Sequence, residues 1–485
     1  VDVDLVQRWA AEGALPTLAM VFDRSLWART APPTGMTWAT WPTLYTGVSP
    51  GRHGRYFYNQ LVPGTYRTEV LRPSVMNHPP FWEALSRNGL RSAVIDVPKT
   101  DPTPDFNGVQ LSDWGGHDPD FYEGPRSWPP GEAHALAARF GTDPVDINDF
   151  GGRGAADIGG FRDRMIANIA RKCRLFEALL TEQDWDLFFG VLDDAHQVGH
   201  LCWHLHDPEH PRHDAALAAR LGDPLKDVYR ALDDALGRIL AHTGRESTVI
   251  VYSSSGMGPA NHGYGLLEPI LRRLEHRPTW RGHIHGALKA GWDRLPHTTQ
   301  RRLRGLKVRL RDDLQGPDWS TRTFFAVPYN DDGGGIRINL RDREPNGVVE
   351  PGAEYDACCA ALIDELCAIV NSDTGRPLIR DVYKRTALYP GACADRLPDL
   401  LIEWNNEAPC FAAHSPRVGT LRHTHSPTRT GSHRPDGLFA AWGPALPTGS
   451  LNRRLPVADI APTIAALLDT PLTDVDGKPI PEIVS

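Results

Sequence analysis

The chain has 485 residues, of which 41% are hydrophobic and 23% are charged, a composition typical of a globular protein with a large core. Its formal net charge of -8 argues against general binding to nucleic-acid backbones, which relies on an excess of lysine and arginine. The 7 cysteines include no CxxC pair, so neither a disulfide framework nor a cysteine-type zinc site is indicated.

The chain shows no sign of membrane insertion or secretion. No apolar run approaches the roughly 18 residues that a membrane-spanning helix needs. The first segment, VDVDLVQRWAAEGALP, is acidic and amphipathic, whereas a signal peptide begins with basic residues followed by an apolar stretch. These features predict a cytoplasmic protein with reduced thiols.

Short apolar runs alternate with amphipathic segments along the chain. The predicted buried strands are residues 92–97, 186–192, 248–253, 399–404 and 438–442. The predicted helices, with apolar residues three and four apart, are 161–180, 224–242, 355–370 and 457–468. This alternation favours an α/β fold with a doubly wound, mostly parallel sheet and helices on both faces.

Residues 265–320 interrupt this pattern with basic, helical sequence such as RRLRGLKVRLR at 301–311. We interpret them as an inserted cap; a solvated basic helix face produces the same pattern. The predicted organisation is a core of residues 1–264 and 321–485 with the cap between its two parts. Ligands bind beyond the carboxyl ends of the strands in such folds, so residues after the predicted strands are the first candidates for a site.

Thr37 is the first candidate site residue. It begins the stretch TWATWPTLYTGVSPGRHG at 37–54, follows the loop PPTGM and opens a short helical segment. Its hydroxyl is therefore expected at a helix N-terminus, where amide groups favour an anion. This position suits a threonine nucleophile, and a simple N-capping threonine gives the same pattern.

Histidines form a candidate metal site. His196 and His200 follow the predicted strand 186–192 and stand four residues apart, so a helix places both imidazoles on one face. His433, in RTGSHRPDG, can add a third imidazole, and His423 and His425 are alternatives. Three protein ligands with one open position are usual at a catalytic zinc site. Further histidines belong to a segment that we expect to face solvent: His204, His206, His210 and His213.

These segments, in this order, resemble the type I phosphodiesterase and nucleotide pyrophosphatase family of the alkaline phosphatase superfamily. Family members have a nucleophilic threonine before a Thr-Gly that leads into P-x-x-H-G, and Thr37, Thr46-Gly47 and PGRHG at 50–54 match that spacing. A later metal-binding DxxxH pair corresponds to His196 and His200, and a GxH segment corresponds to GSH at 431–433. The segments GGIRINLRDREPNGVVEPGAEYD, LPDLLIEWN, HRPDGLFAAWGP and DIAPTIAALLD extend the resemblance over nearly the whole chain.

The resemblance implies an alkaline-phosphatase-like fold and a two-metal hydrolase of phosphodiester or pyrophosphate bonds, with phosphomonoesters as further candidate substrates. The threonine would be phosphorylated or nucleotidylated and then released by water. Zinc is the usual ion, with manganese as an alternative, and the implied partner is a small phosphate-containing molecule. Asn59 is the nearest candidate for the family's phosphate-holding asparagine.

The chain departs from the family at its metal sites. His196 stands where the DxxxH pair has its aspartate, and the family's SDHGM is replaced by SSSGM at 253–257. The resemblance places another aspartate ligand just before Val1. Serine is a poor zinc ligand, so the second site is expected to be weak, empty or rebuilt, with His262 as a candidate substitute. Two alternative functions follow: a mononuclear zinc hydrolase acting on another bond in a specialised pathway, or a noncatalytic descendant.

Overall fold

The computed structural model describes residues 1–73, 76–115, 124–145, 157–275, 319–423 and 428–484. The predicted strands are confirmed as β4 (Ser92–Ile95), β7 (Leu187–Gly190), β8 (Val249–Tyr252), β14 (Leu400–Trp404) and β18 (Gly437–Trp442). The predicted helices are confirmed as α7 (Ile158–Glu182), α10 (Pro224–Leu240), α14 (Ala353–Cys367) and α16 (Ile460–Leu467), the last preceded by the 3-10 turn Val457–Asp459. None of the described helices is long and apolar enough to cross a membrane.

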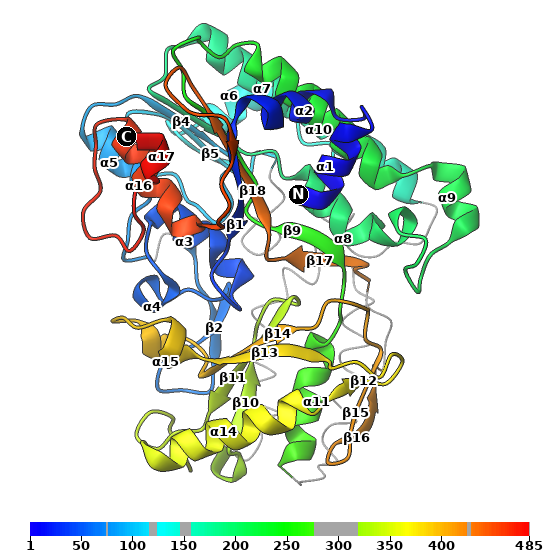
Figure 1. The fold of residues 1–485 in the computed structure, drawn as a ribbon. Coiled ribbons are helices and arrows are strands. Elements are labelled where there is room, and N and C mark those ends of the chain that lie inside the picture. Colours follow the sequence, from blue (N-terminus) through cyan, green and yellow to red (C-terminus); the bar gives the residue numbers. More distant parts are fainter. Residues whose placement is uncertain (74–75, 116–123, 146–156, 276–318, 424–427, 485) are drawn as a thin grey trace.

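Two sheets, with helices around them, lie in the upper half of the molecule as drawn in Figure 1. In one, β18 lies between β1 (Leu26–Ala31) and β8, and both pairings are antiparallel. In the other, β4 lies between β5 (Gly108–Ser112) and β7, and both pairings are parallel.

Helices cover both faces of the β4 sheet, as predicted. Ala93 and Ile95 belong to a buried cluster that includes Phe176 of α7. Val94 belongs to a different cluster, with Trp82 of α5 (Phe81–Arg87). Burial on both faces explains why this strand is apolar at consecutive positions instead of alternating with polar residues.

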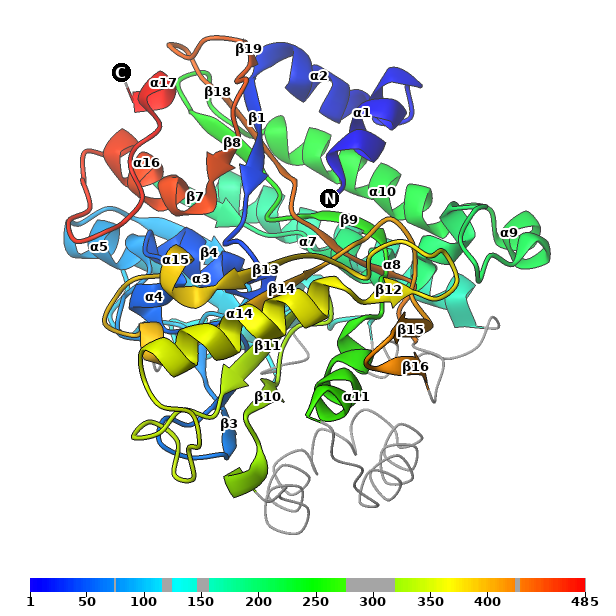
Figure 2. The same ribbon diagram turned by 60° about the horizontal axis from the view of Figure 1, so that its bottom comes forward.

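A third sheet, in the order β10 (Phe324–Val327), β11 (Gly333–Ile338), β14 and β13 (Ile379–Lys384), is wholly antiparallel. Figure 2 shows α14 lying across it. Ile336 and Ile402 pack in a cluster with residues of α14 and α11 (Tyr264–Leu274). Leu401 belongs instead to a cluster with Met36 and Ala39, so one face of this sheet supports the segment that contains Thr37.

The expectation of a mostly parallel sheet is not met in the described residues, whose strands form several separate sheets with mainly antiparallel pairings. The strand β14 shows why its apolar sequence did not predict the direction of its neighbours. Its residues are almost all buried, as in a parallel strand, yet both of its neighbours are antiparallel. Burial on two faces, not strand direction, produces a continuous apolar run.

The predicted cap lies mainly outside the described residues, which omit 276–318. Its first residues belong to α11. Leu267, Ile270 and Leu271 of this helix are buried in the cluster formed with β11 and β14. This helix is therefore packed on the third sheet.

Candidate active site

Thr37 lies where the sequence predicts, at the beginning of a short helical segment. It is the first residue of the 3-10 turn Thr37–Ala39, which continues into α3 (Thr40–Thr46). Met36 and Trp38 on either side are buried, whereas Thr37 is only half-buried. Its carbonyl accepts a hydrogen bond from the Thr40 hydroxyl at 2.6 Å. The neighbouring residues thus anchor the turn while Thr37 keeps access to solvent.

His196, His200 and His433 form a trio, and their nearest ring nitrogens all lie within 4.8 Å of one another. The first two stand one turn apart on α8 (Asp194–His206), and the third comes from β17 (Gly431–Arg434). The Nε2 atoms of His196 and His200 are 2.9 Å apart. The ring centroids of His433 lie 5.0 Å from those of both other histidines. The structure therefore brings together the predicted set of three imidazoles.

The three imidazoles of the trio are unprotonated near pH 7, which is the form that binds a metal ion. Burial, neighbouring histidines and Arg429 hold the pKa of all three imidazoles well below the usual value, so they are neutral near pH 7. His200 donates from Nδ1 to the Gly431 carbonyl at 2.8 Å, which directs the lone pair of its Nε2 toward the other rings. Three neutral nitrogen donors fit a zinc ion with one open position.

A close approach of β17 to α8 completes the trio. The Thr430 amide donates to the His200 carbonyl at 2.8 Å, immediately before β17 begins. A Cβ atom at Gly431 would lie 2.1 Å from the carbonyl oxygen of Gly199. Only glycine permits this contact between backbones, and it sets the depth at which His433 enters the trio.

A buried ion cluster anchors the N-terminal end of α8. The Nζ of Lys172 lies 3.1 Å from the Asp96 carboxylate and 3.5 Å from that of Asp193, which directly precedes α8. Burial lowers the pKa of Lys172, but Asp96, Asp193 and Asp194 outweigh it and raise the pKa overall. The lysine is therefore charged, and it holds the turn that carries His196.

Replacing this lysine is expected to destabilise the protein. Lys172→Met leaves the buried Asp96 and the partly buried Asp193 without their cation, and loss of one partner of a buried ion pair costs about 3–5 kcal/mol. Arg174→Met, at an exposed position of the same helix, should change stability by about 0.5 kcal/mol or less. Urea unfolding of both variants measures the difference, and equal stability would contradict the anchoring role.

The other histidines lie outside the trio. His204 bonds to the Thr430 hydroxyl at 3.2 Å, His206 to Asp223 at 2.6 Å and His213 to the His204 carbonyl at 2.8 Å. The expectation that this segment faces solvent is wrong for His210, which is only 4% exposed. The 207–214 turn folds back toward α8, and the ring of His210 lies 6.3 Å from that of His204.

The alternative ligands are placed elsewhere or are not described. His423 donates from Nε2 to the His262 carbonyl at 3.0 Å, and His262 packs against Phe411. Neither belongs to the trio, which is the one group of three or more potential metal ligands found in the described part of the chain. His425 lies outside the described residues.

Serines occupy the strand end where the resemblance places further ligands. Ser253, Ser254 and Ser255 follow β8. The Ser255 hydroxyl lies 3.1 Å from Nδ1 of His433, and the Ser253 hydroxyl donates to the Ser255 carbonyl at 2.9 Å. The nitrogen of Val1 lies 3.0 Å from that same carbonyl. This side of the trio thus presents hydroxyls in place of a carboxylate and an imidazole.

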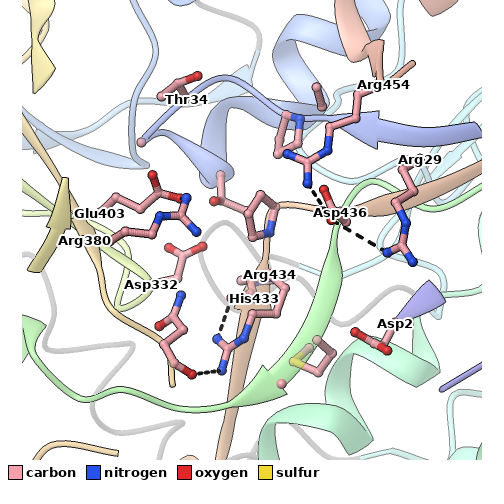
Figure 3. A pocket seen from close by; sticks show the side chains of 18 of the residues that line it. Asp2, Arg29, Thr34, Asp332, Arg380, Glu403, His433, Arg434, Asp436 and Arg454 are labelled. Carbon is pink, nitrogen blue, oxygen red and sulfur yellow. Dashed lines mark hydrogen bonds and ion pairs between the residues drawn. The ribbon is translucent and has the colours of Figure 1, made fainter. Parts of the chain in front are cut away.

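A pocket of about 820 Å³ opens beside these elements and is lined by both Thr37 and His433. Figure 3 shows Asp332, Arg380 and Glu403 on one side and Arg29, Asp436 and Arg454 on the other. Most of these charges are paired: Arg380 with Glu403, and Arg29 and Arg454 with Asp436. The pocket is polar, with acidic and basic groups in similar numbers.

Asp332 is a pocket residue that the sequence did not single out. Its carboxylate interacts with the Thr37 side chain, and this interaction opposes the effect of burial on the pKa of Asp332. Its signal in the sequence is the DD pair before the glycine-rich strand β11, but acidic pairs in such turns are common. Asn59, the candidate for phosphate binding, begins the strand Asn59–Leu61 of a hairpin and does not line this pocket.

The family model for type I phosphodiesterase / nucleotide pyrophosphatase matches residues 1–425, which include Thr37, His196 and His200. No curated protein matches the chain. Among solved structures, phosphonoacetate hydrolase from Sinorhizobium meliloti 1021 in complex with phosphonoformate has a TM-score of 0.51 at 14% identity, covering 93% of this chain and 89% of that chain. Murine ectonucleotide pyrophosphatase / phosphodiesterase 5 has a TM-score of 0.49 at 13% identity, covering 97% and 94%. The chain therefore belongs to the type I phosphodiesterase / nucleotide pyrophosphatase family of hydrolases, within the alkaline phosphatase superfamily.

Proposed function

We propose that this protein hydrolyses phosphodiester or pyrophosphate bonds, with Thr37 as the nucleophile and a metal ion held by the trio of His196, His200 and His433. The observation that carries the proposal is the shared pocket. Thr37 and His433 line the same cavity, and His433 lies within 4.8 Å of the other two imidazoles. A nucleophile and a metal site that share one cavity can act on the same bond.

Zinc fits the trio better than manganese does, because neutral imidazoles suit zinc whereas manganese prefers carboxylate and water oxygens. When bound, such an ion supplies a Lewis acid that polarises a phosphoryl oxygen. The outward hydrogen bonds of His200 and His433, to Gly431 and Ser255, orient the two rings.

Positive charge beside the trio favours an anionic substrate. Lys99 lies 4.4 Å from the ring centroid of Trp38, next to Thr37, and its Nζ donates to the Trp38 carbonyl at 3.3 Å. Lys99 and Arg429 both contribute to the lowered pKa of His196 and His433. Positive charges in these positions attract a phosphate group and stabilise charge that develops on its oxygens.

In the proposed reaction, the Thr37 oxygen attacks phosphorus and the leaving oxygen departs with the electron pair of the broken bond. Water then attacks the phosphorylated threonine and restores its hydroxyl. The half-buried position of Thr37, between the buried Met36 and Trp38, holds the oxygen toward the pocket. Such positioning supplies a large part of the acceleration in phosphoryl transfer.

A substrate panel tests this function. Protein loaded with zinc is assayed on an aryl phosphodiester, a dinucleotide, an aryl phosphomonoester and an aryl sulfate, before and after removal of the ion by a chelator. We expect the two diester-type substrates to be hydrolysed fastest, with loss of activity on chelation and recovery on return of zinc. No turnover of any panel member would contradict the proposal.

The serines at 254 and 255 favour a second candidate, a mononuclear hydrolase acting on a different bond. They replace the aspartate and histidine that the family resemblance leads us to expect at the second metal site. This function predicts about one zinc ion per chain together with no hydrolysis of the diesters. Phosphonoacetate belongs in the panel for this reason, because the structurally similar Sinorhizobium protein is a phosphonoacetate hydrolase.

A further inference from the structure

Asp332 connects the third sheet to Thr37. It lies directly before β11, where a Cβ atom at Gly333 would be 3.4 Å from the Gly35 carbonyl oxygen, and its carboxylate interacts with the Thr37 side chain. Both residues line the pocket that also contains His433, and Figure 3 shows the Asp332 side chain within it. A carboxylate from a distant part of the chain thus lies in the same pocket as the proposed nucleophile.

Buried contacts fix the two groups relative to each other. Tyr329, three residues before Asp332, is 2% exposed and donates from its hydroxyl to the Gly35 carbonyl, two residues before Thr37. Tyr389 donates to the Thr34 carbonyl at 2.7 Å. Both tyrosines belong to a cluster with Met36 and Leu401. The contact between Asp332 and Thr37 therefore joins two packed elements and is not a chance meeting of mobile side chains.

The two adjacent acids have different partners. Asp331 pairs with Arg429 at 3.1 Å, whereas the Asp332 carboxylate interacts with the Thr37 side chain. Burial and then Asp331 raise the pKa of Asp332 to about 7, against the opposing effects of Thr37 and Arg429. A carboxylate of this basicity accepts a proton from a hydroxyl more readily than an ordinary aspartate does.

We propose that Asp332 is the general base that receives the Thr37 proton as the Thr37 oxygen attacks phosphorus. This inference rests on the proposed function. The bond between the Thr37 oxygen and phosphorus forms, the bond to the leaving oxygen breaks, and that oxygen keeps the electron pair. The proton moves from Thr37 to Asp332, which later returns it to the leaving oxygen or to solvent.

The serines at 254 and 255 explain why Thr37 would need a general base. In the two-metal scheme that the family resemblance implies, a second ion activates the threonine. Here the positions expected to hold part of that site are hydroxyls, which bind zinc poorly. A free threonine hydroxyl is a weak nucleophile near neutral pH and needs an adjacent base when no ion lowers its pKa. Asp332 meets this need.

Asp332→Asn tests the role on the full chain loaded with zinc, because asparagine keeps the size of the side chain and removes the base. We expect kcat on the aryl phosphodiester to fall about 10²–10⁴-fold, the usual contribution of a general base, while KM and zinc content stay close to those of the original protein. Asp331→Asn is the matched control, and its kcat should fall less than about tenfold. A kcat of Asp332→Asn within tenfold of the original protein would overturn the proposal, and so would a loss of zinc in proportion to activity.

Two further measurements separate this inference from the proposed function. Asp332→Ala should regain part of its lost rate when formate is added, since formate can take the place of the missing carboxylate. A dialkyl phosphorofluoridate, which phosphorylates activated hydroxyls with release of fluoride, should label Thr37 more slowly in Asp332→Asn. If the original protein hydrolyses no diester but Asp332→Asn is still labelled more slowly, the role of Asp332 as base is supported and only the proposed function is overturned. If Asp332→Asn and the original protein are labelled at the same rate and formate restores no activity, the role of Asp332 as general base is overturned.

Discussion

Thr37→Ala is expected to abolish hydrolysis of the aryl phosphodiester, with kcat falling on the order of 10⁴-fold or more. The reason is that no oxygen remains to form the covalent intermediate, so the variant must rely on direct attack by water. Its zinc content should stay unchanged, because Thr37 is not part of the trio of histidines. Steady-state kinetics and metal analysis of the purified variant measure the two quantities.

Matched variants of the same loop make this result specific. Thr34→Ala removes an exposed hydroxyl that lines the same pocket, and kcat should stay within a few-fold of the original value. Thr37→Ser keeps a nucleophilic oxygen and should retain measurable activity. Mass analysis of a rapidly quenched reaction should find phosphate on residue 37 in the original protein. Full activity of Thr37→Ala would mean that the nucleophile lies elsewhere, and absence of activity in every form would favour a noncatalytic descendant.

The histidine pair could be predicted from local sequence because a helix fixes its geometry over four residues. His196 and His200 needed only a helical segment after a strand, and α8 provides it. His433 was one of three distant candidates. His433 joins the trio only because β17 packs against α8 at the close contact between Gly431 and Gly199. This contact joins segments far apart in the chain, so no local sequence pattern could predict it.

Strand positions followed from apolar runs, but strand directions did not. The runs report burial, and β14 is buried between antiparallel neighbours as fully as a parallel strand would be. Asp332 escaped prediction for a related reason. Its contact with Thr37 requires the third sheet to dock on the Thr37 segment through Tyr329 and Leu401, which only the assembled fold brings about.

His433→Ala is expected to remove the bound zinc and, with it, the hydrolytic activity. The trio supplies the three imidazole donors, and two neutral ligands hold zinc far less strongly than three. Loss of an outer hydrogen-bond partner alone weakens a metal site about 10–100-fold, so loss of a direct ligand should exceed that range. Metal analysis after equilibration in a zinc buffer, and calorimetric titration of the metal-free protein, measure the change.

His204→Ala is the matched control for this prediction because His204 continues the same four-residue spacing on α8 beyond His196 and His200 but bonds to Thr430 instead. It should keep its zinc. The amount in the original protein is informative as well: about one ion per chain agrees with hydroxyls at positions 254 and 255, and about two would show that a second site is built from other groups. Retention of zinc by His433→Ala together with its loss from His204→Ala would contradict the assignment, because the ion would then be held by the histidines around Thr430 and not by the trio beside the pocket of Thr37.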